Sequence, residues 1–188
     1  NLVCGAGETG AAVVTHPAAA KIAFTGSTEV GKIIMRQLAG TDKKLTLELG
    51  GKAANIVFDD SPIDQAVEGV VNGIFFNQGH VCCAGSRLLV QESIAEMFVA
   101  KLKNRIDVLR VGNPLDKNTD VGAINSRAQL DRICELVDSG VSAGAEMYQS
   151  AVCRLPGKGY YFKPTVFTGV TQSHRIAREE IFGPVLSV

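Results

Sequence analysis

Apolar residues recur along this chain with two alternating periods. Short apolar runs and period-two alternation predict strands at residues 22–25, 45–49, 55–58, 88–90, 160–162 and 185–188. A period of three to four residues predicts the intervening helices, which start after Gly26, after Pro62, near Ser93 and near Ser126, with one more helical turn near residues 176–179. Strands that alternate with helices are typical of an α/β fold with a mainly parallel sheet.

The pattern also predicts helix faces and helix ends. Four apolar residues after Gly26 lie on one predicted face: Val30, Ile33, Ile34 and Leu38. Ser93-x-x-Glu96 and Ser126-x-x-Gln129 match the capping box, in which the serine accepts a hydrogen bond from the backbone at the start of a helix. The sequence thus predicts side-chain caps on both later helices.

Composition and charge exclude several classes of protein. Of the 188 residues, 46% are hydrophobic and 20% are charged, which is ordinary for a globular chain. The formal net charge is zero and like charges do not cluster, so nothing favours binding to nucleic acid or to an anionic membrane. No apolar run approaches the ~20 residues that span a bilayer. Both ends fall inside strand-like segments, so we expect the chain to be a piece of a longer protein.

The cysteine spacing argues against a disulfide-bonded or metal-bound framework. The five cysteines are Cys4, Cys82, Cys83, Cys134 and Cys153. Their odd number and the lack of a CxxC pair favour neither a disulfide network nor a structural zinc site. We therefore predict no metal and a reducing compartment, the cytoplasm, with the mitochondrion as the alternative. Cys4, Cys134 and Cys153 are interpreted as small buried apolar residues.

Two glycine-rich segments are candidates for phosphate binding. Residues 5–10, Gly-Ala-Gly-Glu-Thr-Gly, fit the GxGxxG dinucleotide pattern, but no acidic residue ends the next predicted strand, so a structural glycine turn is an equal alternative. Residues 26–31, Gly-Ser-Thr-Glu-Val-Gly, join a strand to a helix start. Backbone N–H groups and the helix dipole favour an anion there, and simple helix capping is the alternative.

Two further segments carry reactive side chains. Glu48 alternates with Leu47 and Leu49 at a strand end that is followed by Gly50 and Gly51. It is either a catalytic carboxylate at a strand end or a solvent-facing one. Residues 75–83 end a helix in Gly79 and present Cys82 beside Cys83. A cysteine is nucleophilic as the thiolate, so a reactive one needs a base or a positive environment nearby.

Taken together, these segments resemble the aldehyde dehydrogenase superfamily. The resemblance rests on four motifs in the family's order and at about its spacings: residues 24–31, residues 48–52, residues 75–82 and residues 179–184. It implies an aldehyde-dehydrogenase-like α/β fold, with the C-terminal part of a Rossmann-type NAD(P)-binding domain at residues 1–51. A catalytic α/β domain with mainly parallel sheet would occupy residues 52–188 and continue beyond them.

The resemblance also assigns roles to residues. It makes Cys82 the nucleophile and Glu48 the base that activates water. It places the cofactor phosphates, of NAD or NADP, at Gly26, Ser27, Thr28, Glu29, Val30 and Gly31. Leu49 would lie beside the nicotinamide, Glu180 would hold the nicotinamide ribose, and Phe182 would pack near it. The chain departs from the family at His80, where the family has glutamine or glutamate.

The implied activity is oxidation of an aldehyde to a carboxylate through a cysteine thiohemiacetal and thioester. The backbone N–H of Cys82 would form half of the oxyanion hole. Alternatives are a non-catalytic structural or scaffold member of the family and a relative that transfers the acyl group to coenzyme A; the presence of both Cys82 and Glu48 favours hydrolysis. We expect a small-molecule aldehyde substrate, a homo-oligomer for the full-length protein, and no turnover from the 188 residues alone.

Overall fold

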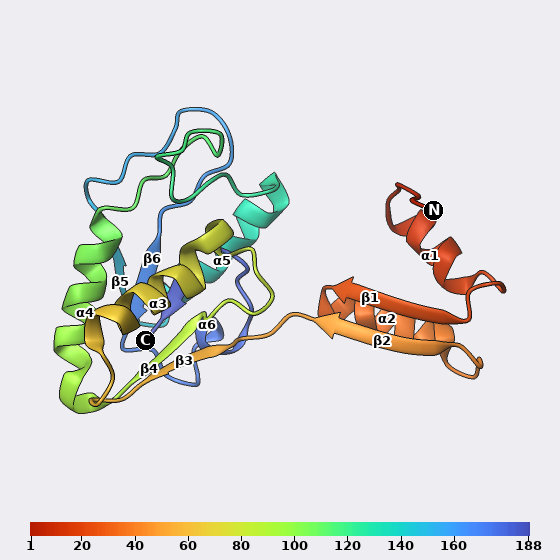
Figure 1. The fold of residues 1–188 in the computed structure, drawn as a ribbon, viewed down its shortest axis with the longest axis horizontal. Helices are drawn as coiled ribbons and strands as arrows, with labels where there is room; N and C mark the ends of the chain where they lie inside the picture. The colour runs from red at the N-terminus through yellow and green to blue at the C-terminus, as the bar shows by residue number, and fades with distance from the viewer. The chain divides into compact units, whose positions relative to one another are not determined.

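The structure is a computed structural model and describes residues 1–188. The chain forms two compact units, Asn1–Gly50 and Gly51–Val188, which are described separately below (Figure 1).

The first unit is a small β-α-β arrangement preceded by a helix. Its elements are α1 (Gly7–Thr15), β1 (Lys21–Gly26), α2 (Thr28–Leu38) and β2 (Lys44–Leu49). The strands β1 and β2 pair in parallel, from Lys21 opposite Lys44 to Gly26 opposite Leu49. The side chains of Val14, Ile22, Ile34 and Leu38 form its core. The strands predicted at residues 22–25 and 45–49 are confirmed.

Two expectations for this unit are wrong. Val30 and Ile33, predicted on the buried face of α2, are 41% and 47% exposed. The buried face is a narrower stripe through Gly31, Ile34 and Leu38, because only a two-stranded sheet lies against the helix. No strand precedes the GxGxxG segment, where α1 begins directly at Gly7. That segment therefore lacks the strand that the dinucleotide fingerprint requires.

The second unit is built on a five-stranded sheet. Its strands are β3 (Ala54–Val57), β4 (Arg87–Val90), β5 (Glu146–Gln149), β6 (Thr165–Thr168) and β7 (Val185–Ser187). They lie in the order β3-β4-β7-β6-β5, and every neighbouring pair is parallel except β5 with β6. The predicted α/β fold with mainly parallel sheet is confirmed.

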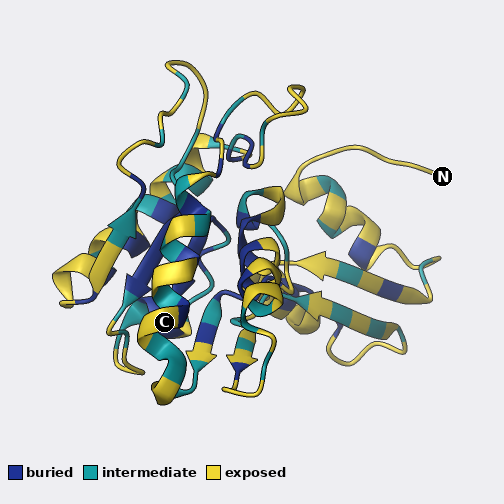
Figure 2. Ribbon diagram, turned by 60° about the vertical axis from the view of Figure 1, so that its left-hand side comes forward, coloured by how far each residue is buried: buried dark blue, intermediate teal, exposed yellow.

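Helices cover both faces of this sheet, and a hydrophobic core lies between the sheet and the helices on each face. The helices are α3 (Ile63–Phe75), the 3-10 turn η1 (Phe76–Gly79), α4 (Glu92–Asp107), α5 (Arg127–Ser142) and α6 (Arg175–Arg178). Val166 and Leu186 belong to one core, with α3 and α4, while their neighbours Phe167 and Val185 belong to the other, with α5 and α6. Successive residues of a strand point to opposite faces, so β6 and β7 are buried on both sides (Figure 2).

The strand predicted at residues 160–162 is wrong. Those residues are irregular, and the carbonyl of Tyr160 accepts a hydrogen bond from the Ile124 N–H at 2.7 Å. The strand β6 instead starts at Thr165, directly after Pro164, which has no N–H to give to a sheet. The predicted cap at Ser126 is confirmed, since its Oγ accepts from Gln129 N at 3.2 Å. The one at Ser93 is wrong, because the N-cap of α4 is Gln91, two residues earlier, and Ser93 lies inside the first turn of the helix.

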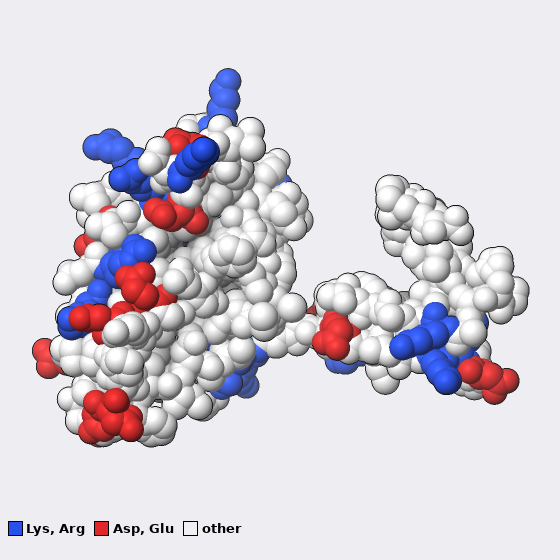
Figure 3. Space-filling model, viewed as in Figure 1, with Lys and Arg blue, Asp and Glu red and all other residues white.

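Charged side chains of both signs alternate on the surface of α3 and α4. Two ion pairs join these helices, Lys101 to Asp64 at 2.7 Å and Arg105 to Glu68 at 2.6 Å (Figure 3). Such exposed pairs contribute little to stability, typically ~0–1 kcal/mol each. Among all the helices, none has both the length and the apolar character that a membrane crossing requires.

Candidate active site

In the first unit, the carboxyl ends of the two parallel strands bring the predicted cofactor segment beside Glu48 and Leu49. Gly26 ends β1 opposite Leu49 of β2, and Thr25 lies opposite Glu48. Ser27 is the N-cap of α2, with its Oγ accepting from Val30 N at 3.3 Å. The backbone N–H groups of the first helical turn thus point out of the same edge of the sheet, where α/β folds bind ligands.

Gly31 and Leu49 are in close contact across this edge. A Cβ on Gly31 would lie 2.7 Å from Cδ2 of Leu49, so only glycine lets the leucine pack onto the helix. Glu48 lies on the other face of β2 and is exposed, as the period-two pattern predicted. The structure therefore brings residues 26–31 and Glu48–Leu49 together within one unit.

In the second unit, an unusual turn leads from α3 to the cysteines. Asn77, Gln78 and Gly79 all have left-handed backbone, with φ of 48°, 47° and 75°. For a non-glycine residue this conformation costs roughly 1–2 kcal/mol. The turn follows the end of α3 at Phe75 and leads into the cysteine segment.

Cys82 lies at the surface just after this turn. Both Cys82 and Cys83 are exposed free thiols, and Ala84 N donates to the carbonyl of Val81 at 3.0 Å, closing a tight turn around them. The following residue, Gly85, donates to Gly73 O at 3.0 Å and accepts from the Asn55 amide at 3.0 Å. Helix α3 and strand β3 therefore fix the turn that presents the cysteine pair.

The other three cysteines differ from one another. Burial raises the thiol pKa of Cys134 and of Cys153, and both are half-buried, not fully buried as predicted. Cys4 is exposed, so its interpretation as a buried residue is wrong. No group of three or more His, Cys, Asp or Glu side chains in residues 1–188 is arranged to hold a metal ion.

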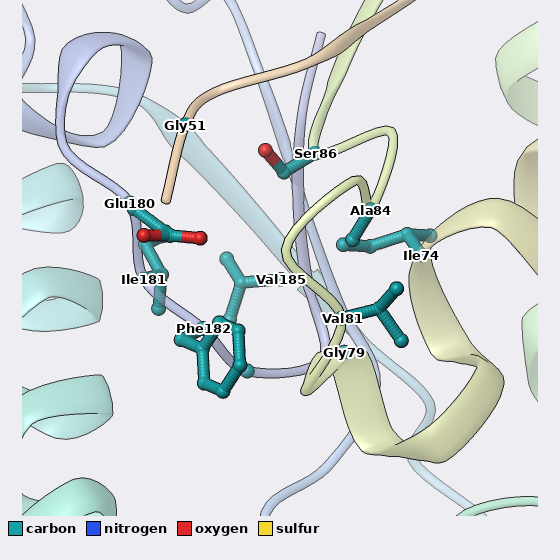
Figure 4. Close-up of a pocket in the computed structure, with 11 residues that line it drawn as sticks. Gly51, Ile74, Gly79, Val81, Ala84, Ser86, Glu180, Ile181, Phe182 and Val185 are labelled. Carbon is teal, nitrogen blue, oxygen red and sulfur yellow. The ribbon is translucent and has the colours of Figure 1, made fainter. Parts of the chain in front are cut away.

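A cleft is lined on one side by the cysteine segment and on the other by the loop that carries Glu180 and Phe182 (Figure 4). One wall contains Gly79, Val81 and Ala84, and the other runs from Glu180 to Gly183. Gly51, Ile74, Ser86 and Val185 complete the lining, and the Glu180 carboxyl lies above the Phe182 ring in this view. Cys82 follows Val81 directly, so the predicted nucleophile lies at the margin of a cleft whose far wall holds two predicted cofactor residues.

Helix α5 and its neighbours hold the far wall in place. The Gln129 side-chain amide donates to the carbonyls of Ile181 and Phe182, at 2.9 and 3.0 Å. Phe182 has a left-handed backbone, φ 53°, and these bonds stabilise it. Glu179 accepts from Arg175 at 2.7 Å and from Arg132 at 2.6 Å. The hydrogen bond from Arg175, joined by that from Arg132, lowers the pKa of Glu179 to about 2.

We expect Gln129→Leu to destabilise the protein by roughly 1–3 kcal/mol, because it leaves the buried Ile181 carbonyl without its donor. Denaturant unfolding of the full-length protein measures the loss. Gln65→Leu is the matched control, since Gln65 is exposed on α3 and should change the unfolding free energy by less than ~0.5 kcal/mol. Equal effects from both variants would contradict the role of Gln129.

Lys52 places a buried amine near the same loop. Its Nζ is buried without a hydrogen-bond partner, and its backbone carbonyl accepts from Arg87 Nε at 2.8 Å. Burial, reinforced by the charge of Arg87, lowers the pKa of Lys52 to about 8, against an opposing attraction from Glu180. The ammonium is therefore partly deprotonated just above neutral pH.

The lowered pKa of Lys52 predicts a pH-dependent stability. Unfolding restores a pKa near 10.5, so the unfolded chain binds more protons between pH 8 and 10.5, and the folded state gains stability as pH rises through that window. The gain is about 3 kcal/mol. Lys52→Met removes it, so the unfolding free energy of the wild type minus that of the variant should rise between pH 7 and pH 10. A difference that does not change with pH would contradict the lowered pKa of Lys52.

Some residues of this site were not predicted from the sequence. Lys52 was taken only as part of a motif, and Gln129 only as the third position of a capping box. Its backbone N–H does donate to the Ser126 cap, but its side chain donates to the carbonyls of residues 52 and 53 positions away. A glutamine facing the core side of a helix, beside Leu130 and Ile133, was the available signal.

Comparison with known proteins agrees with the fold and the motifs. The model of the aldehyde dehydrogenase family matches residues 1–188. An aldehyde dehydrogenase of Emericella nidulans is 50% identical over 190 residues, covering 100% of this chain and 38% of that protein. The HpcC structure from Thermus thermophilus superposes with a TM-score of 0.93 at 44% identity, over 100% of this chain and 38% of that one. Betaine aldehyde dehydrogenase from Staphylococcus aureus, solved in complex with NAD+, has a TM-score of 0.92 at 39% identity, with coverage of 100% and 38%.

Each unit is an α/β arrangement with parallel strands, and each presents one exposed candidate side chain, Glu48 in the first and Cys82 in the second. The chain belongs to the aldehyde dehydrogenase family. It spans a little over a third of the length of these relatives, 38% in the Emericella protein.

Proposed function

We propose that the full protein oxidises an aldehyde to a carboxylate with NAD+ or NADP+, using Cys82 as nucleophile. The observation that carries the proposal is the exposed Cys82 thiol beside a cleft whose opposite wall presents Glu180 and Phe182. Membership of the aldehyde dehydrogenase family over the whole chain supports the same chemistry.

Cys82 acts first. Its thiolate attacks the aldehyde carbonyl carbon, and the carbonyl oxygen becomes an oxyanion that accepts a hydrogen bond from the Cys82 backbone N–H. The resulting thiohemiacetal loses a hydride and collapses to a thioester on Cys82. The bound cofactor supplies the hydride acceptor, its nicotinamide ring. The tight turn from Val81 to Ala84 fixes the backbone of Cys82, and this N–H with it, during both changes.

Glu48 acts second. Its carboxylate takes a proton from a water molecule, which attacks the thioester carbonyl and releases the carboxylate product and the Cys82 thiolate. Glu48 suits this role because it is exposed at the end of β2, where nothing in its own unit covers it. General-base assistance of this kind is typically worth ~10²–10⁴-fold in rate.

The residues assigned to the cofactor fit a dinucleotide. The Ser27 cap takes the Val30 N–H and leaves the backbone N–H groups of Thr28 and Glu29, at the start of α2, available to phosphate oxygens, and Gly26 carries no side chain to obstruct them. Thr28, Glu29 and Val30 would line this turn, and Leu49 packs beside it on Gly31. In the second unit Glu180 would accept hydrogen bonds from ribose hydroxyls, and Phe182 would offer a flat apolar surface. The NAD+ held by the Staphylococcus relative supports a nicotinamide cofactor.

Product analysis tests the proposal. The full-length protein is supplied with an aldehyde and either NAD+ or NADP+, once without and once with coenzyme A. It should form carboxylate and reduced cofactor in the reaction without coenzyme A. Formation of acyl-coenzyme A alone would establish an acylating relative, and no product with any aldehyde would favour a scaffold. A homo-oligomer, a cytoplasmic location and inactivity of residues 1–188 alone remain predictions.

A further inference from the structure

The cysteine segment and the Glu180–Phe182 loop meet through their backbones. Gly79 has a left-handed backbone, and a Cβ there would collide with the carbonyl of Gly183. A side chain on Gly183 would in turn lie 2.6 Å from Cδ1 of Ile133 on α5. The two loops are therefore in direct contact at a pair of glycines, one residue away from His80 and from Phe182.

At this junction His80 stacks on Phe182. Their ring centroids are 5.3 Å apart and their planes differ by 6°. Rings that are so nearly parallel at this separation are offset, which is a preferred arrangement for aromatic pairs. The stack joins the segment that leads to Cys82 with the loop that carries Glu180.

The Phe182 ring has few other restraints. Phe182 belongs to neither hydrophobic core of the second unit, and its side chain is only partly buried at the cleft. The hydrogen bonds from Gln129 hold the backbone on either side of it, not the ring. The orientation of the ring therefore depends on what packs on its face, and His80 occupies that face.

The imidazole of His80 is suited to stacking rather than to proton transfer. Its Nε2 is buried and has no hydrogen-bond partner, and burial lowers its pKa from the usual value, so the ring is neutral at neutral pH. A flat, uncharged side chain at this position can be replaced by another aromatic ring without losing a hydrogen bond at Nε2.

We propose that His80 is a positioning residue for the nicotinamide end of the cofactor: by stacking on Phe182 it holds that ring in the cleft and so strengthens dinucleotide binding. This role rests on the proposed function, which places Phe182 against the cofactor. In this role His80 needs an aromatic ring and does not change its protonation state.

The test compares His80→Leu with His80→Phe in the full-length protein. Both replacements are apolar and of similar size, and only phenylalanine keeps the ring. Fluorescence titration with NADH or NADPH gives the dissociation constant without turnover. Loss of one aromatic stack should raise the dissociation constant by about 2- to 10-fold in His80→Leu. In His80→Phe the dissociation constant should stay within about twofold of the wild-type value. An unchanged constant in His80→Leu, or an equal loss in both variants, overturns the proposal.

A double-mutant cycle then asks whether His80 acts through Phe182. Phe182→Leu removes the ring. Because leucine is also a non-glycine residue, the energetic cost of the left-handed backbone at this position stays the same. If His80 acts through that ring, adding His80→Leu to Phe182→Leu should weaken binding no further; additive losses overturn the proposal. Should His80→Leu fail to fold, His80→Gln, which has no ring, takes its place with the same expected loss. A wild-type protein that binds neither dinucleotide would instead overturn the proposed function, and this role with it.

Discussion

Replacing Cys82 with serine should abolish aldehyde oxidation by the full-length protein, with a fall in kcat on the order of 10³-fold or more. A thiol with a reference pKa of ~8.5 is a few per cent thiolate at neutral pH and is intrinsically nucleophilic. A serine hydroxyl remains almost wholly protonated there. The side chain is exposed and its thiol has no role in either core, so the substitution should leave folding and dinucleotide binding intact.

Cys83→Ser is the matched control for this experiment. Cys83 is the adjacent residue, is equally a free exposed thiol, and belongs to the same tight turn. It should keep kcat within a few-fold of the wild type. The steady-state rate of reduced-cofactor formation and the dinucleotide dissociation constant together distinguish the two variants. More than a tenth of wild-type turnover in Cys82→Ser, or a comparable loss in Cys83→Ser, would remove Cys82 as the sole nucleophile.

The buried sheet was largely predictable from the sequence. Strand β7 is buried throughout, as expected for a strand that helices cover on both faces. Strand β4 is also marked by an apolar run, although its Leu89 is 47% exposed. The edge strand β5 was not predicted: Glu146–Gln149 is half-exposed and does not alternate, so no period marks it. Its pairing with β6 is set by tertiary contacts, from Glu146 opposite Thr168 to Gln149 opposite Thr165.

The geometry that supports the site was less predictable. Left-handed backbone is expected at Gly79, but nothing local predicts it at Gln78 or at Phe182, where other parts of the fold impose it. The bond from Gln129 to Phe182 spans 53 residues and leaves no mark in local sequence. Glu48 and Cys82 were selected by the order and spacing of four motifs, whereas taken singly each residue type has ordinary structural interpretations.

The experiment on Glu48 separates the two halves of the reaction. If this carboxylate activates water for thioester hydrolysis, Glu48→Gln should slow steady-state turnover by about 10²–10⁴-fold while acylation of Cys82 proceeds. Glutamine keeps the size and the hydrogen bonding of the side chain but cannot accept the proton. At the exposed end of β2 it should fold normally, since Glu48 forms no part of the core of its unit.

Rapid mixing of this variant with excess aldehyde and cofactor should give a burst of about one reduced nicotinamide per active site, followed by a slow phase. Mass spectrometry during the slow phase should locate the acyl group on Cys82, not on Cys83. Glu96→Gln, which alters an exposed glutamate on α4, is the control and should show wild-type turnover. Loss of the burst would mean that Glu48 also deprotonates the thiol. Unchanged turnover would remove Glu48 from the reaction, because a water attacking the thioester at the normal rate would then be activated by another base.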